Sequence, residues 1–148
     1  MRIAVLADTH DRVPPALPAA LAGADEIWHL GDVCAPAIAD ALAQLGSPLR
    51  VVRGNCDDCL DWPHALDFAL EGFRIRLEHI PPSTPPEEID LLLHGHTHVP
   101  RNEHRGPVRF LNPGCITRPN RGAPASFAWL ELSKGQPIRW ELVLTAAL

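Results

Sequence analysis

Two helical patterns alternate with three apolar segments in the first third of the chain, and this alternation restricts the fold more than any other feature. The apolar segments are rich in branched side chains, which is typical of buried strands. They comprise residues 2–7, 26–32 and 48–55. Residues 14–24 and 35–46 have helical patterns that end near Gly23 and Gly46, although Pro18 interrupts the first. This strand–helix–strand order predicts parallel strands joined by right-handed crossovers.

The second half of the chain predicts hairpins instead of helices. Alternating apolar residues at 67–80 and 126–144 indicate two hairpins, which turn at Glu71-Gly72 and near Lys134-Gly135. A proline-rich linker is expected at residues 81–88, and two further strands are expected at residues 89–95 and 108–114. Helices early and hairpins late favour an α/β fold with two facing mixed β-sheets flanked by helices, in a single domain over residues 1–148.

Composition fits a globular protein and excludes some functions. The chain has 148 residues, 46% hydrophobic and 21% charged, which is ordinary for one folded domain with a substantial core. A formal net charge of −5 gives no basic surface for general nucleic-acid binding, so a phosphate-bearing substrate would need local arginines or metal. No apolar run reaches the roughly 18 residues of a membrane span. The first residues enter a strand directly, so we expect no secretory signal and a cytoplasmic location.

Four cysteines could indicate a metal knuckle or a redox pair. Cys56 and Cys59 have C-x-x-C spacing, whereas Cys34 and Cys115 are isolated and form no second knuckle. A redox motif usually opens a helix after a strand, but "NCDDCLDWP" has the composition of a loop. We therefore expect reduced, partly buried thiols.

Polar residues follow the predicted strands, and together they form the candidate site. Asp8 and His10 follow the first strand, Asp32 follows the second, and Asn55 follows the third. Later strands end in His79, His96 and His98. Because the carboxyl ends of parallel strands share one edge of a sheet, we expect these seven side chains to meet there.

Each of these residues also has an ordinary structural explanation. Aspartate after a strand often caps a helix, and asparagine after glycine is common in turns. Isolated histidines are usually solvated or hydrogen-bonded, and this interpretation is retained for His29, His64 and His104. His94 is expected to pack behind the site because it alternates with its neighbours. Seven such groups at five strand ends nevertheless favour a shared site.

The seven side chains are suitable ligands for transition metals. Imidazoles, carboxylates and an amide oxygen suit Mn²⁺, Fe, Zn²⁺ or Ni²⁺ better than Ca²⁺ or a structural zinc. Seven ligands are too many for one tetrahedral ion but suit two ions that share a carboxylate. Two metals about 3.5–4 Å apart can hold both the attacking and the leaving oxygen of a phosphoryl group.

The ordered motifs resemble those of the calcineurin-like metallophosphoesterases. Four blocks carry the resemblance: "DTH" at 8–10, "GD" at 31–32, "GN" at 54–55 and "GHTH" at 95–98. The stretches "RGNCD" and "LNPGCITRPN" further resemble the small single-domain YfcE-type phosphodiesterase branch. The resemblance extends over nearly the whole chain, and its specificity comes from the combination of blocks.

The resemblance implies a dinuclear metal centre and a function. Seven residues would share two divalent ions: Asp8, His10 and His98 on one, Asn55, His79 and His96 on the other, and Asp32 bridging both. A metal-bridging hydroxide would attack phosphorus in line and hydrolyse a phosphoester bond. The implied protein is a metal-dependent phosphodiesterase of small phosphoester substrates that uses two ions, Mn²⁺ or alternatively Ni²⁺, Zn²⁺ or Fe.

Two positions depart from the family pattern. Many larger relatives have a histidine after "GN", whereas Cys56 stands here as the candidate acid for the leaving group. The family usually has glycine after the histidine at position 79, but Ile80 and two prolines follow here. His64 is therefore kept as an alternative to His79 as a metal ligand.

Other functions remain open. A phosphomonoesterase would share the metal core and differ in its pocket. A non-catalytic scaffold is the third hypothesis, because the retromer subunit of similar fold binds proteins. The sequence does not identify substrate-binding residues, although Arg12, Arg118 and Arg121 lie near the expected site, and it leaves homo-oligomerisation open.

Overall fold

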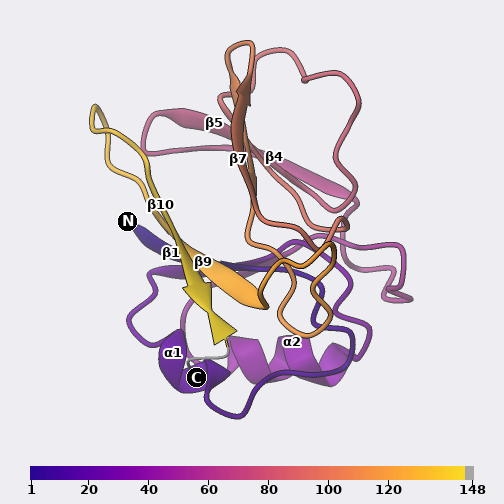
Figure 1. Ribbon diagram of the computed structural model, residues 1–148. Helices are drawn as coiled ribbons and strands as arrows, with labels where there is room; N and C mark the ends of the chain where they lie inside the picture. Colours follow the sequence, from indigo (N-terminus) through magenta and orange to yellow (C-terminus); the bar gives the residue numbers. More distant parts are fainter. Residues whose placement is uncertain (146–148) are drawn as a thin grey trace.

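The computed structural model describes residues 1–145, which form two mixed β-sheets that face one another (Figure 1). In the first sheet the strand order is β10-β9-β1-β2-β3, with β1, β2 and β3 parallel and β9 antiparallel to β1. Its strands are β1 (Arg2–Leu6), β2 (Glu26–His29), β3 (Leu49–Val51), β9 (Ser126–Glu131) and β10 (Arg139–Leu144). The predicted parallel strands of the first third are confirmed.

The second sheet has the order β4-β5-β6-β8-β7. Its three central strands β5, β6 and β8 are parallel, and the edge strands β4 and β7 pair antiparallel to them. These strands are β4 (Ala65–Leu70), β5 (Phe73–Glu78), β6 (Leu91–Leu93), β7 (Arg101–Arg105) and β8 (Val108–Asn112). The predicted fold class of two facing mixed sheets is therefore confirmed, but among the described residues helices flank only the first sheet.

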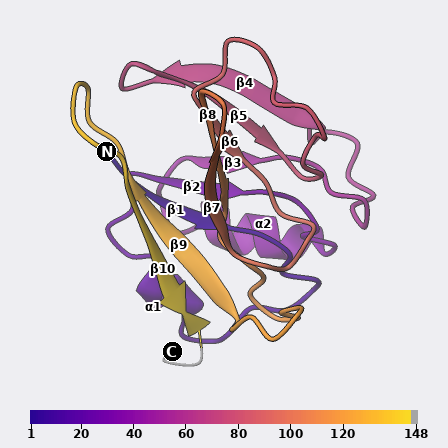
Figure 2. The same cartoon turned by 45° about the horizontal axis from the view of Figure 1, so that its top comes forward.

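Both helices cover the outer face of the first sheet (Figure 2). Helix α2 (Pro36–Ala43) buries Ile38 and Leu42 there. The expected helix at 14–24 shrinks to a single turn, α1 (Leu17–Ala20), because Pro18 lacks the N–H that a longer helix needs. Within residues 1–145 no helix covers the outer face of the second sheet. None of the described helices is long and apolar enough to cross a bilayer.

Apolar side chains from both sheets interlock between them and hold the layers together. Val5 and Trp28 from the first sheet, together with Leu77 and Leu93 from the second, are fully buried in this layer. The alternation of each strand sends every second side chain into it. The register therefore also fixes which residues stand at the strand ends, where the polar residues follow.

One strand was not expected from the sequence. Strand β7 has the sequence RNEHR, which contains no apolar residue, and most of it is exposed at the edge of its sheet. Its position depends on pairing with β8, not on burial. The predicted turn at Glu71-Gly72 is confirmed, with φ of 52° and 86°, and it joins the paired residues Leu70 and Phe73.

The layer between the sheets makes a specific prediction about stability. Leu130 is fully buried in that layer, so Leu130→Ala should lower the free energy of unfolding by about 3 kcal/mol. Leu60 is 83% exposed, and Leu60→Ala should change it by less than about 0.5 kcal/mol. Urea denaturation measures both. Equal effects of the two substitutions would contradict the assignment of this layer as the main core.

Candidate metal centre

The seven predicted residues meet at one edge, where the parallel strands of both sheets end. Strands β1, β2 and β3 deliver residues from the first sheet, and β5 and β6 deliver those from the second. Segments far apart in the sequence thus become neighbours: His96 N donates to Asp8 Oδ2 at 3.2 Å across 88 positions. The structure brings together all seven side chains that the strand-end pattern identified.

One side of the cluster is built around Asn55. Its Oδ1 lies 2.9 Å from His96 Nδ1 and 3.1 Å from His79 Nε2. His79 Nε2 is also 3.4 Å from Asp32 Oδ2. One ligand atom each of Asp8, Asp32 and His79 lies within 4.8 Å of the others. These atoms could contribute to holding one ion.

The other side is built around the second histidine pair. His10 Nε2 lies 3.1 Å from His98 Nε2, and His98 Nε2 lies 3.3 Å from Asp8 Oδ1. Ligand atoms of these three residues are all within 4.8 Å of one another. Asp32 Oδ2 lies 3.8 Å from His10 Nε2 and so stands between the two sides.

Backbone carbonyls orient two of the imidazoles. His79 Nδ1 donates to Leu30 O at 2.8 Å, and His98 Nδ1 donates to Arg118 O at 2.6 Å. Because each Nδ1 keeps its proton for the carbonyl, Nε2 is the nitrogen that faces the cluster and that would bind a metal once it is deprotonated. Metal-binding histidines are commonly oriented by such a hydrogen bond on the other nitrogen.

Asp8 is fully buried, and one of its carboxylate oxygens has no hydrogen-bond donor among the described residues. Its Oδ1 is one of two buried side-chain oxygens in residues 1–145 with no hydrogen-bond partner. Burial raises the pKa of Asp8 to about 6, although the charges of His79 and His98 oppose the shift. A buried carboxylate oxygen of this kind is costly unless a cation or a hydrogen-bond donor contacts it. The donor set around Asp8 therefore fits a bound metal ion.

Asp32 and His79 are electrostatically linked. Burial raises the pKa of Asp32, but hydrogen bonds from His79 and from Cys56 N–H outweigh it and hold that pKa well below its usual range. Burial likewise lowers the pKa of His79, and the hydrogen bond to Asp32 and the charge of Asp8 reverse that effect. Asp32 is thus ready to bind a cation as a carboxylate.

The backbone at these residues is unusual. Five of the seven have positive φ: Asp8, His10, Asp32, His96 and His98, at 56°, 44°, 54°, 68° and 57°. Residues other than glycine rarely adopt this conformation, and such strain concentrates at functional sites. The loops therefore accept a local cost that aims these side chains at a common point.

A buried aspartate that the sequence pattern did not identify connects the loops. Asp57 Oδ2 accepts hydrogen bonds from Asp32 N at 2.9 Å and Gly54 N at 2.8 Å. Its Oδ1 accepts another from Cys34 N at 2.7 Å. Asp57 follows no strand directly, and only its place in the "RGNCD" block could have drawn attention to it.

None of His29, His64 and His104 belongs to a group of ligand atoms in the described residues, although His64 borders a cavity with Asn55 and His79. His29 is fully buried, with Nε2 3.1 Å from Thr9 Oγ1, and burial lowers its pKa to about 4. His64 is exposed and contacts Arg53, whereas His79 is buried within the cluster. The geometry thus favours His79 over His64 as the ligand. His104 is exposed on β7.

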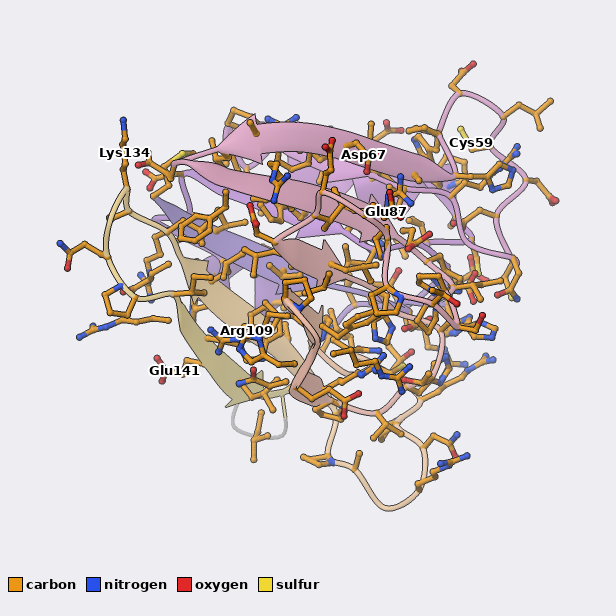
Figure 3. The ribbon with its side chains drawn as sticks, turned by 90° about the horizontal axis from the view of Figure 1, so that it is seen from above. Cys59, Asp67, Glu87, Arg109, Lys134 and Glu141 are labelled. Atoms are coloured by element: carbon orange, nitrogen blue, oxygen red, sulfur yellow. The ribbon has the colours of Figure 1, made fainter. Side chains whose placement is uncertain are left out.

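The remaining candidates have separate positions. All four cysteines are free thiols, and Cys59 lies on a loop at the periphery (Figure 3). Cys56 N donates to Asp32 Oδ1 at 2.8 Å, which places its thiol beside the cluster. Arg12 is exposed, and Arg121 borders a cavity next to His96.

This fold and its cluster of candidate metal ligands are typical of the metallophosphoesterase class, and comparison with known proteins agrees. The chain belongs to the calcineurin-like phosphoesterase superfamily, whose domain model matches residues 1–135. Phosphodiesterase YfcE of Escherichia coli K12 is 31% identical over 88% of both chains. A probable metallophosphoesterase of Methanothermobacter thermautotrophicus is also 31% identical, over 99% of this chain and 94% of its own.

Solved structures show the same architecture. That of the phosphoesterase YfcE from Escherichia coli matches with a TM-score of 0.76 and 28% identity, over 97% of this chain and 99% of its own. Zinc-bound Vps29 of Entamoeba histolytica matches with a TM-score of 0.78, over 97% of this chain and 99% of its own. The Vps29 likeness, at 22% identity, shows the fold alone.

Gly54 provides a direct test of how tightly the loops are packed. A Cβ at this position would lie 2.2 Å from Asp32 Oδ1 and 2.3 Å from Asp32 N. Gly54→Ala should therefore displace Asp32 and lower the free energy of unfolding by about 2 kcal/mol. Gly46→Ala is the control. A Cβ at Gly46 would meet open space, so only the strain of an alanine at a φ of +87° should lower the free energy of unfolding, by about 1 kcal/mol. Denaturant unfolding compares them, and equal losses would contradict close packing at Gly54.

Proposed function

We propose that this protein is a metal-dependent phosphodiesterase of small phosphoester substrates. The observation that carries the proposal is the buried Asp8 Oδ1, which has no hydrogen-bond partner among residues 1–145 and faces His98 Nε2 at 3.3 Å. A cation is the group that such an oxygen and such imidazoles would share. Family membership supports phosphoester chemistry as the use of that cation.

Seven residues would hold two divalent ions: Asp8, His10 and His98 on one, Asn55, His79 and His96 on the other, and Asp32 bridging both. The grouping of Asp8, His10 and His98 supports the first site, and the contacts of Asn55 with His79 and His96 support the second. Asp32 Oδ2 lies 3.8 Å from His10 and 3.4 Å from His79, between the two. Nitrogen and oxygen donors of this kind suit Mn²⁺, with Ni²⁺, Zn²⁺ and Fe as alternatives. When bound, such ions lower the pKa of water and neutralise phosphoryl oxygens during in-line displacement.

The residues of the chain supply orientation and charge. Leu30 O and Arg118 O keep the Nε2 atoms of His79 and His98 directed at the cluster. Asp57 fixes the backbone at Asp32. The Cys56 thiol is the candidate proton donor to the leaving group, because burial and the nearby Asp32 raise its pKa and keep it protonated at neutral pH.

The relatives support a diester as the substrate class. The similar Escherichia coli protein is named a phosphodiesterase, and it aligns with most of this chain. A phosphomonoesterase would use the same ligands, and a scaffold of the Vps29 kind would use the same fold. Comparing turnover of a diester with turnover of a monoester distinguishes the phosphodiesterase from the phosphomonoesterase. Metal binding without turnover of either ester would identify the scaffold.

His79 and His64 give the sharpest test of the metal centre. His79→Ala should reduce metal from two ions to one per chain and lower kcat/KM for bis(4-nitrophenyl) phosphate by at least about 100-fold. His64→Ala should retain both ions and the activity, because His64 lies outside the cluster. Elemental analysis and a nitrophenolate assay with Mn²⁺ measure both.

Three results would contradict the proposal. Two bound ions with no hydrolysis of diester or monoester would favour the scaffold. Faster hydrolysis of 4-nitrophenyl phosphate than of the diester would favour the phosphomonoesterase. Loss of metal in His64→Ala but not in His79→Ala would reassign the ligand.

The leaving-group acid is tested separately. Cys56→Ser should leave hydrolysis of bis(4-nitrophenyl) phosphate within about twofold, because nitrophenolate leaves without a proton. It should slow hydrolysis of diphenyl phosphate about tenfold, because phenolate is a poorer leaving group. Equal rates of wild type and variant on diphenyl phosphate would remove the thiol from the mechanism.

A further inference from the structure

A cavity of about 520 Å³ opens directly beside His96, at the end of the second sheet. Its volume is typical of small-molecule sites. Arginines dominate its charged lining: Arg101, Arg105 and Arg121 stand against the single carboxylate of Glu103. This local excess of positive charge contrasts with the net charge of −5 for the whole chain.

Arg101 is fixed in the wall of this cavity. Its guanidinium carbon lies 4.4 Å from the centre of the Phe110 ring, and its side chain is 18% exposed. Arg101 Nη1 lies 3.2 Å from His94 Nε2, and Nε donates to Glu103 Oε1 at 2.9 Å. A stacked and hydrogen-bonded guanidinium loses little freedom when it binds a ligand.

His94 is the support behind Arg101. Its Nδ1 donates to Gly95 O at 3.0 Å, so the neutral ring offers its Nε2 lone pair to the guanidinium. Asn112 Nδ2 donates to the same carbonyl at 2.9 Å and fixes the backbone there. The buried His94 thus positions Arg101 from the interior of the sheet.

Arg101 retains binding capacity after these contacts. A guanidinium has five N–H donors, and His94 and Glu103 occupy three in Arg101, leaving two without a partner in residues 1–145. Arg105 Nε also donates to Glu103 Oε1, at 3.2 Å. One carboxylate therefore serves two arginines, and the cavity keeps a surplus of positive charge.

We propose that this cavity is a subsite for a second anionic group of the substrate, with Arg101 as its principal contact. The inference rests on the proposed phosphodiesterase function and specifies its substrate class: phosphodiesters that carry an additional phosphate. His96 belongs to both the metal cluster and the cavity wall. His96 is two positions from His94, a backbone span of at most about 7 Å, and His94 Nε2 lies 3.2 Å from Arg101 Nη1. One small substrate can therefore reach from the metal cluster to Arg101.

A pair of nucleotides that differ in one phosphate tests the subsite without requiring turnover. Calorimetric titration of the Mn²⁺-loaded protein should show thymidine 3′,5′-bisphosphate binding about tenfold tighter than thymidine 5′-monophosphate. Arg101→Gln should reduce this preference to about twofold or less. It should leave the affinity for the monophosphate nearly unchanged. The preference should also decrease as salt rises.

A matched control removes the same charge elsewhere. Arg139 lies on β10 of the other sheet, with a side chain that is 81% exposed, and Arg139→Gln should keep the full preference. Arg101→Lys keeps the charge but not the planar pair of donors, and its preference should fall at least threefold. This variant decides the question if Arg101→Gln does not fold.

Kinetics separate failure of the subsite from failure of the proposed function. The thymidine 5′-(4-nitrophenyl phosphate) ester should be hydrolysed faster, by kcat/KM, when it carries a 3′-phosphate. If neither ester is hydrolysed, the proposed phosphodiesterase function is contradicted, and the binding titration still tests the subsite. Equal affinity for the two nucleotides, or an equal loss of preference in Arg101→Gln and Arg139→Gln, would overturn the subsite.

Discussion

The convergence of parallel strand ends from two sheets is the constraint on which the rest of the structure depends. Each sheet contributes three parallel strands, and their carboxyl ends meet at one edge of the molecule. The layer of apolar side chains between the sheets fixes their register. Asp8 and Asp32 can be buried together only because imidazoles from the other sheet oppose them.

That burial has an energetic consequence. Two carboxylates and several imidazoles at close range are unfavourable in a protein interior without a compensating charge. The raised pKa of Asp8 and the lowered pKa of Asp32 are two expressions of this conflict, because burial outweighs the favourable contacts at Asp8 and hydrogen bonds outweigh burial at Asp32. The left-handed backbone at five of the seven residues adds a further local cost. Divalent cations would relieve both carboxylates at once.

Histidine serves three purposes in this chain, and its surroundings distinguish them. His79 and His98 direct their Nε2 atoms at the carboxylates, because backbone carbonyls accept a hydrogen bond from Nδ1. His29 is buried among hydrogen bonds beneath the site. His94 has the same protonated Nδ1 as the cluster histidines, but its Nε2 supports Arg101 at the wall of the neighbouring cavity. The residue type alone does not separate these roles.

The sequence by itself determined every described strand except β7, the turn at Glu71-Gly72 and the seven polar residues of the candidate site, because period-two burial and strand-end position are local signals. Tertiary structure alone decided the rest. Strand β7 has no apolar pattern, and Asp57 and Arg101 act through partners up to 25 positions away. Such contacts depend on sheet pairing and loop geometry, which no single segment encodes. The proposal of His79 instead of His64 as a ligand likewise rests on burial, which depends on how the two sheets pack.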